Sequence, residues 1–202
     1  MNRKTEGVGF IRSGKYEMLA TEGVGIARDN IVTRRLSTEG VFLGKKVRCT
    51  EGIKVEGVAK GRIDACGCVD ISLIAGETKI QRTDDNKVVF KGEGVITVSA
   101  VEVDDFHFQG KCKIGTLKAK EVFILKANNN QVNQPQSIVD EIVCKKLIAY
   151  NIKARKVTAQ EVELYGDSVI DTLVYEAMSH CSPECVIKKP VMMQEGASDK
   201  FV

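Results

Sequence analysis

The residue types that could hold a metal ion gather at two places in this sequence. His180, Cys181 and Cys185 lie within the six residues HCSPEC, and Cys66 and Cys68 flank a single glycine. Zn²⁺ prefers thiolate and imidazole ligands, and a structural zinc site commonly needs four of them. Neither group supplies four, and a shared site would require two chains to meet because the groups are far apart in the sequence. We therefore predict unliganded thiols, and His180, Cys181 and Cys185 remain the metal candidates.

General acid or base chemistry has no clear pair of residues in the chain. His107 lies between Phe106 and Phe108, which we expect to point inward, so its ring should lie on the surface without a catalytic partner. Neighbouring residues on a strand face opposite ways, so adjacent acids cannot form the carboxylate pair that glycoside hydrolysis uses. The adjacent acids are Asp84/Asp85 and Asp104/Asp105. We predict no catalytic residue, no cofactor and no enzymatic activity.

Very short strands at a regular spacing are the dominant pattern of the chain. Apolar or small residues occur in pairs two apart, the period of a strand, and successive pairs begin five or six residues apart. A helix would place apolar residues at i, i+3 and i+4, and an ordinary strand would alternate for longer. The pattern predicts a coil of short strands joined by bends, a β-solenoid. The clearest pairs are Ile96/Val98, Val101/Val103, Phe106/Phe108, Cys112/Ile114, Leu117/Ala119, Val122/Ile124, Leu147/Ala149, Ile152/Ala154, Val157/Ala159 and Val162/Leu164.

A four-residue repeat in the N-terminal half sets the length of one turn. Thr-Glu-Gly-Val occurs at residues 5–8, 21–24 and 38–41, offsets of 16 and 17, with a shortened fourth copy at 50–53. Three sides of five or six residues fit these offsets, and four sides do not. We expect corner glycines at Gly7, Gly23, Gly40 and Gly52. The predicted inward pairs are Val8/Phe10, Val24/Ile26, Val41/Leu43, Val47/Cys49, Ile53/Val55, Ile63/Ala65 and Val69/Ile71.

Composition agrees with one elongated domain and excludes some partners. Glycine at 18 greatly outnumbers proline at 3, which suits frequent tight bends, and a net charge of +3 gives no footprint for nucleic acid. No apolar run is long enough to span a membrane, and the MNRKT start does not resemble a signal peptide, so we expect a cytoplasmic protein. Cys49, Cys112 and Cys144 fall at inward positions, where reduced, buried thiols are expected.

The pattern divides the chain into a short tail, a coil and a C-terminal segment. We predict a tail at 1–5, a β-helix domain at 6–176, and a cap or flexible tail at 177–202. RTDDNK at 82–87 interrupts the spacing as a turn, and the Asn/Gln-rich residues 127–136 are a loop insertion that could bind a partner. A rung of 16 residues would also set Glu102 against Lys118 and Asp104 against Lys120.

The repeated EGV corners, the five-residue spacing and the run IKARKVTAQEVELYGDSVIDTL at 152–173 resemble the bactofilin family of polymer-forming bacterial cytoskeletal proteins. The resemblance covers roughly residues 40–176. It implies a single-stranded, right-handed, three-sided β-helix, here of about ten rungs of 16–17 residues. It also implies nonpolar filaments that assemble end to end without nucleotide, often on the inner membrane face. The chain departs from the family in its irregular N-terminal rungs, its Asn/Gln insertion and its lack of an evident membrane-targeting peptide, so membrane attachment is left open.

The leading functional hypothesis is a scaffold subunit supporting cell shape, the cell envelope or motility. Its partners would be other copies of itself and envelope proteins, with no nucleic acid and no small-molecule substrate. We expect the polymer interface to include Val8 and Phe10 at one end and Val169 and Leu173 at the other. The alternative is a monomeric β-solenoid protein-binding module of the pentapeptide-repeat kind. That kind requires four-sided rungs and a regular Ala-Asp/Asn-Leu repeat, which this chain lacks. A solenoid enzyme acting on sugars is the least favoured class. The chain also differs from the hexapeptide-repeat acyltransferases, which show a six-residue spacing and a catalytic histidine.

Overall fold

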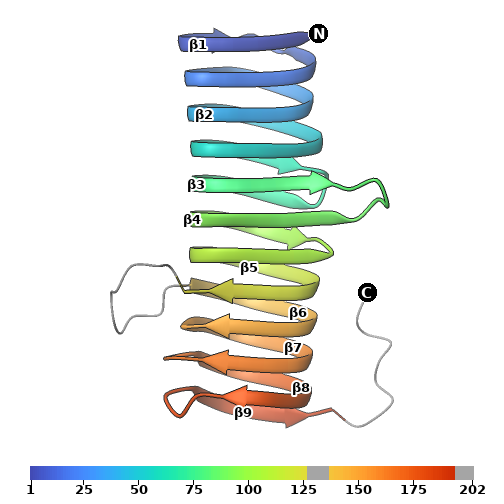
Figure 1. Ribbon diagram of the computed structural model, residues 1–202, viewed down its shortest axis with the longest axis vertical. Coiled ribbons are helices and arrows are strands. Elements are labelled where there is room, and N and C mark those ends of the chain that lie inside the picture. Colours follow the sequence, from blue (N-terminus) through green and yellow to red (C-terminus); the bar gives the residue numbers. More distant parts are fainter. Residues whose placement is uncertain (127–136, 194–202) are drawn as a thin grey trace. The chain divides into compact units, whose positions relative to one another are not determined.

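Each of the two compact units of the chain folds into a coil of β-strand whose successive turns stack (Figure 1). The computed structural model describes residues 1–126 and 137–193, and it is 87% strand with no helix among those residues. Two compact units are present, Met1–Ala100 (unit 1) and the described part of Val101–Val202 (unit 2). Each is a β-solenoid, and together they hold about 11 turns. The predicted all-β solenoid is confirmed.

The strands are as follows. Unit 1 holds β1 (Asn2–Ile11), β2 (Gly14–Ala65), β3 (Val69–Arg82) and most of β4 (Val88–Glu102), which crosses the boundary in sequence. Unit 2 holds β5 (Asp105–Leu125), β6 (Ser137–Tyr150), β7 (Ile152–Tyr165), β8 (Val169–Cys181) and β9 (Val186–Met192). The predicted insertion at 127–136 lies outside the described residues.

In unit 2, successive strands from β5 to β9 pair in parallel, each one turn beyond the last. Ile142 lies beside Val157 and Val157 beside Leu173, offsets of 15 and 16, and all three side chains are fully buried. β6 carries three inward pairs, one for each side of the turn, as the five-residue spacing predicts. These pairs are Ser137/Val139, Ile142/Cys144 and Leu147/Ala149.

The predicted stacking at the start of unit 2 is also present. The amide of Val103 donates to the carbonyl of Lys118 (3.0 Å), and the amide of Lys120 donates to the carbonyl of Asp104 (2.8 Å). Asp104 and Lys120 form the expected ion pair at 2.8 Å. The Glu102 contact with Lys118 stays a prediction. The four side chains expected inside are buried: Val101, Val103, Leu117 and Ala119.

Part of the N-terminal inward assignment is wrong. The threonine of each Thr-Glu-Gly-Val repeat is buried, whereas the valine that follows faces outward. The glycine between them turns the corner with positive φ, so the strict alternation of a strand does not continue across it. The buried threonines are Thr5, Thr21 and Thr38, and the pairs that face outward are Val8/Phe10, Val24/Ile26 and Val41/Leu43. The other predicted pairs before residue 72 are buried.

Glycines stack along this corner of unit 1. A Cβ added to Gly40 would overlap the carbonyl of Gly23, and one added to Gly57 would overlap the carbonyl of Gly40. Gly57 has φ of +131°, whereas Gly52 is not among the positive-φ glycines. The fourth corner copy is therefore the VEGV of residues 55–58, seventeen residues after the third, and not the TEGI of 50–53. The corner needs glycine because neighbouring backbones touch there.

The chain reverses direction after β2, which the sequence analysis did not predict. β3 runs antiparallel to the end of β2, with Ile53 beside Ile80 and Gly57 beside Gly76. The reversal is a tight hairpin in which the amide of Cys68 donates to the carbonyl of Ala65 (3.1 Å). Its two central residues, Cys66 and Gly67, have φ of +59° and +70°, as a type I′ turn requires.

A second hairpin begins at Thr83 and restores the original chain direction. The amide of Asn86 donates to the carbonyl of Thr83 (2.9 Å), and the amide of Thr83 donates to the carbonyl of Lys87 (2.8 Å). Asn86 has φ of +65°, the conformation that closes a three-residue hairpin loop. The predicted turn at 82–87 is thus confirmed, and its effect is to let β4 follow β2 in direction.

Candidate assembly edges and surface sites

β1 is the terminal strand of unit 1 and has one open edge. It pairs in parallel with β2 from Asn2 beside Met18 to Ile11 beside Ala27. Within the described residues of unit 1, β1 stands at the end of the strand order, so its other edge has no strand beside it. Such an edge presents unpaired N–H and C=O groups and is a template for another chain.

The core is nearly closed at this end. The inward residues Thr5 and Ile11 are only 6% and 3% exposed, so the end offers a backbone edge and little apolar cross-section. Val8 and Phe10, expected inside the end rung, instead face outward and are 73% and 55% exposed. The guanidinium carbon of Arg28 lies 4.7 Å from the centre of the Phe10 ring. These two side chains flank the open edge and do not fill the end of the core.

The C-terminal end differs from the prediction because one further strand covers the expected interface. β9 pairs in parallel with β8, placing Val186 beside Val169 and Pro190 beside Leu173. Leu173 is fully buried as a result, and Val169 is half-buried. The described part of the segment predicted as a cap or tail is therefore another rung, and the interface residues at this end belong to β9.

The sequence of β9 carries features that discourage further pairing. It reads VIKKPVM, and Lys188 reaches back to Asp171 at 2.7 Å. The amide of Met193 donates to the carbonyl of Tyr175 (2.7 Å), so by alternation the nitrogen of Pro190 lies on the free side, where it cannot donate. Lysine and proline are common protections of edge strands. We missed this edge in the sequence, although Lys188, Lys189 and Pro190 were the signal for it.

The structure brings the thiols of Cys181 and Cys185 within interaction range but does not gather them with His180 as metal ligands. The His180 ring stacks on Tyr165 with centroids 4.3 Å apart. The Cys185 thiol donates to the carbonyl of Gly166 (3.2 Å), and partial burial raises its pKa. Across residues 1–126 and 137–193, no group of three His, Cys, Asp or Glu side chains is arranged to hold a metal ion.

The other residues considered for chemistry lie in a hairpin, in a ring contact or in ion pairs. Cys66 and Cys68 belong to the first hairpin, and burial raises the pKa of Cys66 to about 11. His107 lies on the outer side, with its ring 4.4 Å from that of Phe123. Asp104 is paired with Lys120, and Asp85 with Lys87 at 2.9 Å.

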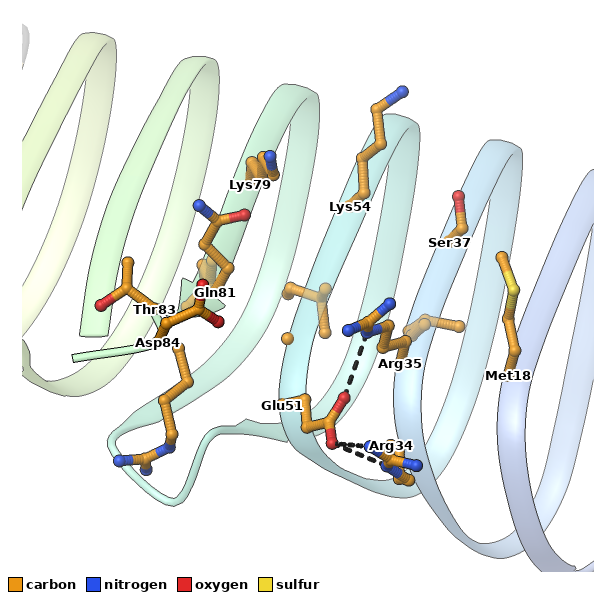
Figure 2. A pocket seen from close by; sticks show the side chains of 15 residues that line it. Met18, Arg34, Arg35, Ser37, Glu51, Lys54, Lys79, Gln81, Thr83 and Asp84 are labelled. Atoms are coloured by element: carbon orange, nitrogen blue, oxygen red, sulfur yellow. Dashed lines mark hydrogen bonds and ion pairs between the residues drawn. The ribbon is translucent and has the colours of Figure 1, made fainter. Parts of the chain in front are cut away.

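A shallow groove of about 660 Å³ lies on the outside of unit 1, between turns of β2 and β3. Figure 2 shows Glu51 joined to both Arg34 and Arg35. Outside this view, Arg34 donates a second hydrogen bond to Glu17 at 2.8 Å. The hydrogen bond from Arg34 lowers the pKa of Glu51. Cations outnumber acids in the lining, so the groove would favour an anionic group over a cationic one. The lining cations are Arg34, Arg35, Lys54, Lys79 and Arg82, and the acids are Glu51 and Asp84.

No family model, curated protein or solved structure matches this chain. None of the described residues belongs to a helix long and apolar enough to cross a membrane. The role of the protein must therefore be inferred from its strands, edges and surface.

Proposed function

We propose that this protein is a structural subunit that polymerises end to end, without nucleotide, into a cytoplasmic scaffold of the bactofilin kind. The observation that carries the proposal is the open edge of β1, a ten-residue strand that pairs only with β2 among the described residues. Strand pairing at such an edge needs no energy source, because it satisfies backbone groups directly. The scaffold would support cell-shape, cell-envelope or motility machinery.

The subunit contact made through β1 should be stronger than the contact made through β9. At the β1 end, two copies related by a two-fold axis can pair β1 against β1, which joins subunits head to head. At the β9 end, Pro190 and Lys189 weaken an equivalent contact. Assembly would then pass through a stable dimer joined at β1, and longer filaments would form as dimers meet through β9. Alternating junctions of this kind give a nonpolar filament.

The proposal is tested by blocking one end at a time. A small folded domain fused directly before Met1 would obstruct β1, and the same domain fused after Val202 serves as the matched control because residues 194–202 separate it from β9. Sedimentation and negative-stain images should show that the first fusion stops at dimers or smaller species, while the second retains larger assemblies. Equal assembly of the two fusions would contradict a role for β1.

The groove in unit 1 favours the second candidate, a monomeric protein-binding module. Lys54 and Lys79 lie side by side across the β2–β3 pair on its wall, and they could receive an acidic segment of a partner. This candidate predicts a monomer at micromolar concentration. A wild-type protein that sediments as a monomer would select it over the scaffold.

A further inference from the structure

One side of unit 1 carries a continuous outward apolar face. In the first two rungs Val8 lies beside Val24 and Phe10 beside Ile26. The stacking of Gly40 on Gly23, seventeen residues apart, continues these two columns to Val41 and Leu43. We call the six residues the apolar face: Val8, Phe10, Val24, Ile26, Val41 and Leu43. All are exposed or half-buried, although soluble strands usually carry polar residues on their outer side.

The valine column passes through the reversal of the chain. Gly57 stacks on Gly40, which places Val58 after Val41, and Val58 lies beside Ala75 in β3. A Cβ added to Gly94 would overlap the carbonyl of Ala75, so Val95 of β4 is the next member. The second column becomes mixed here, with Lys60 beside Leu73. The face is therefore most apolar over the first three rungs.

Columns of opposite charge border this face. On the glycine side, each rung places an exposed or half-buried glutamate next to its corner glycine. On the other side, a cation follows the second apolar column at offsets of 16 and 17. The glutamates are Glu6, Glu22, Glu39, Glu56, Glu77 and Glu93, and the cations are Arg12, Arg28, Lys45 and Arg62. The order across the face is thus acidic, apolar, apolar, basic. Within the chain, Lys4 pairs with Glu6 and Glu22 at 2.9 Å. Lys54 pairs with Glu56, whereas Glu39 forms no ion pair among the described residues.

We propose that the apolar face binds the same face of a second copy of this chain. Two copies can face each other about a two-fold axis that runs either along the columns or across them. An axis along the columns sets the four glutamates of the first four rungs, Glu6, Glu22, Glu39 and Glu56, against a cation of the other copy at the same rung. In the first three rungs it also sets valine against Phe, Ile or Leu. An axis across the columns would set glutamate against glutamate. Electrostatics selects the first arrangement, in which the two copies of unit 1 run in the same direction.

The size of the face indicates a contact that depends on assembly. With the rest of the valine column included, six strands at about 4.8 Å and four residues at about 3.3 Å give a patch of about 400 Å². A stable pair of proteins buries about 800 Å² on each partner. A single contact of this kind is weak, whereas a row of subunits joined end to end adds many such contacts. The inference therefore rests on the proposed function, because only end-to-end filaments repeat the weak contact. It adds lateral pairing of these filaments to that function.

The first test compares two outward side chains of equal exposure. Leu43 and Val32 are both 38% exposed, but Val32 lies outside the apolar face. Leu43→Lys should leave filaments of single width and weaken lateral association at least tenfold, whereas Val32→Lys should leave paired filaments unchanged. Melting curves should be similar for the two variants because both side chains face outward. Paired filaments that survive Leu43→Lys would overturn the proposal.

The second test is independent of filament length. ¹⁴N- and ¹⁵N-labelled wild-type chains are mixed before assembly and treated with a carbodiimide, which links a carboxylate to an amine in contact. Glu39 should couple to Lys45 of the partner subunit, giving peptides that carry one light and one heavy half. Links that join only light to light and heavy to heavy would overturn the proposal.

The outcomes separate lateral pairing from end-to-end assembly. Single-width wild-type filaments would reject lateral pairing and retain the proposed function. Lateral dimers with the mixed-isotope link but no filaments would reject the proposed end-to-end assembly and retain lateral pairing. Binding of wild type, but not Leu43→Lys, to anionic lipid vesicles in the absence of that link would overturn the proposal in favour of a membrane surface.

Discussion

Gly57 and Gly76 lie directly opposite each other, each with φ of +131°, although the chain runs in opposite directions through them. Each occupies the same corner of its rung. The sequence around them is mirrored, since Val-Glu-Gly at 55–57 meets Gly-Glu-Thr at 76–78. The corner therefore depends on the glycine and on the inward residue two positions away, and not on the direction of the chain.

Replacing a stacked corner glycine should destabilise unit 1. In Gly40→Ala the new Cβ would overlap the carbonyl of Gly23 at a φ of +125°, so we expect a loss of about 2 to 4 kcal/mol. Gly7→Ala is the matched control, because Gly7 has φ of +66° and no atom within 4 Å of its added Cβ. It should lose only about 1 kcal/mol. Chemical denaturation measures both, and equal losses would mean that the glycine contacts do not constrain the corner.

The buried threonines should be better replaced by valine. The hydroxyl of Thr38 is buried without a hydrogen-bond partner in the described residues, and Val55 fills the equivalent place one rung on. Thr38→Val should therefore stabilise the fold by about 1 kcal/mol. Thr33 is equally buried, but its hydroxyl donates to the carbonyl of Arg35 at 2.8 Å. Thr33→Val should lower the melting temperature, and the same sign of change in both variants would contradict this explanation.

The regular part of the coil could be predicted because each inward pair is set by local alternation. Ile142/Cys144 and Val157/Ala159 are buried as predicted, since no special backbone conformation interrupts their strands. Across the N-terminal corners the alternation breaks at a positive-φ glycine, and a valine such as Val24 reads as inward when it is outward. The residue type alone does not show whether an apolar side chain after a corner glycine points into the core or out of it.

The reversal of β3 and the assembly ends were harder to predict. Cys66 and Cys68 suggested ligands, whereas Cys66 and Gly67 are the centre of a turn; the mirrored Gly-Glu-Thr of 76–78 was the available signal. The end residues depend on which strand is last, a property of the whole coil. Leu173 was predicted at an interface but is covered by β9, whose alternation is obscured by Lys188 and Lys189.

The inward positions of unit 2 should not accept a charge. Leu117 is fully buried, so Leu117→Asp would place an unpaired carboxylate in a narrow apolar core at a cost of several kcal/mol. Ile138→Asp is the control, because Ile138 is an exposed apolar residue of the same unit. Circular dichroism melts should show a large loss for the first variant and a small change for the second. A Leu117→Asp protein that melts with the wild type would contradict the inward assignment.

The cysteines should divide into two classes of reactivity. Burial raises the pKa of Cys112 and of Cys144 to about 12, and it raises that of Cys49 as well. Below these values the thiols stay protonated and shielded, so iodoacetamide at pH 8 should not modify them in the folded protein. Cys181 is exposed and should react first. Peptide mass spectrometry reports the sites, and rapid labelling of Cys144 without denaturant would contradict its burial.

Negative-stain imaging of the purified wild-type chain tests the central claim most directly. The protein should form filaments at micromolar concentration without nucleotide, and they should persist in high salt, because strand pairing at β1 does not depend on long-range charge attraction. The domain fused before Met1 should abolish them. Dispersed single particles at the same concentration, with or without nucleotide, would contradict end-to-end assembly.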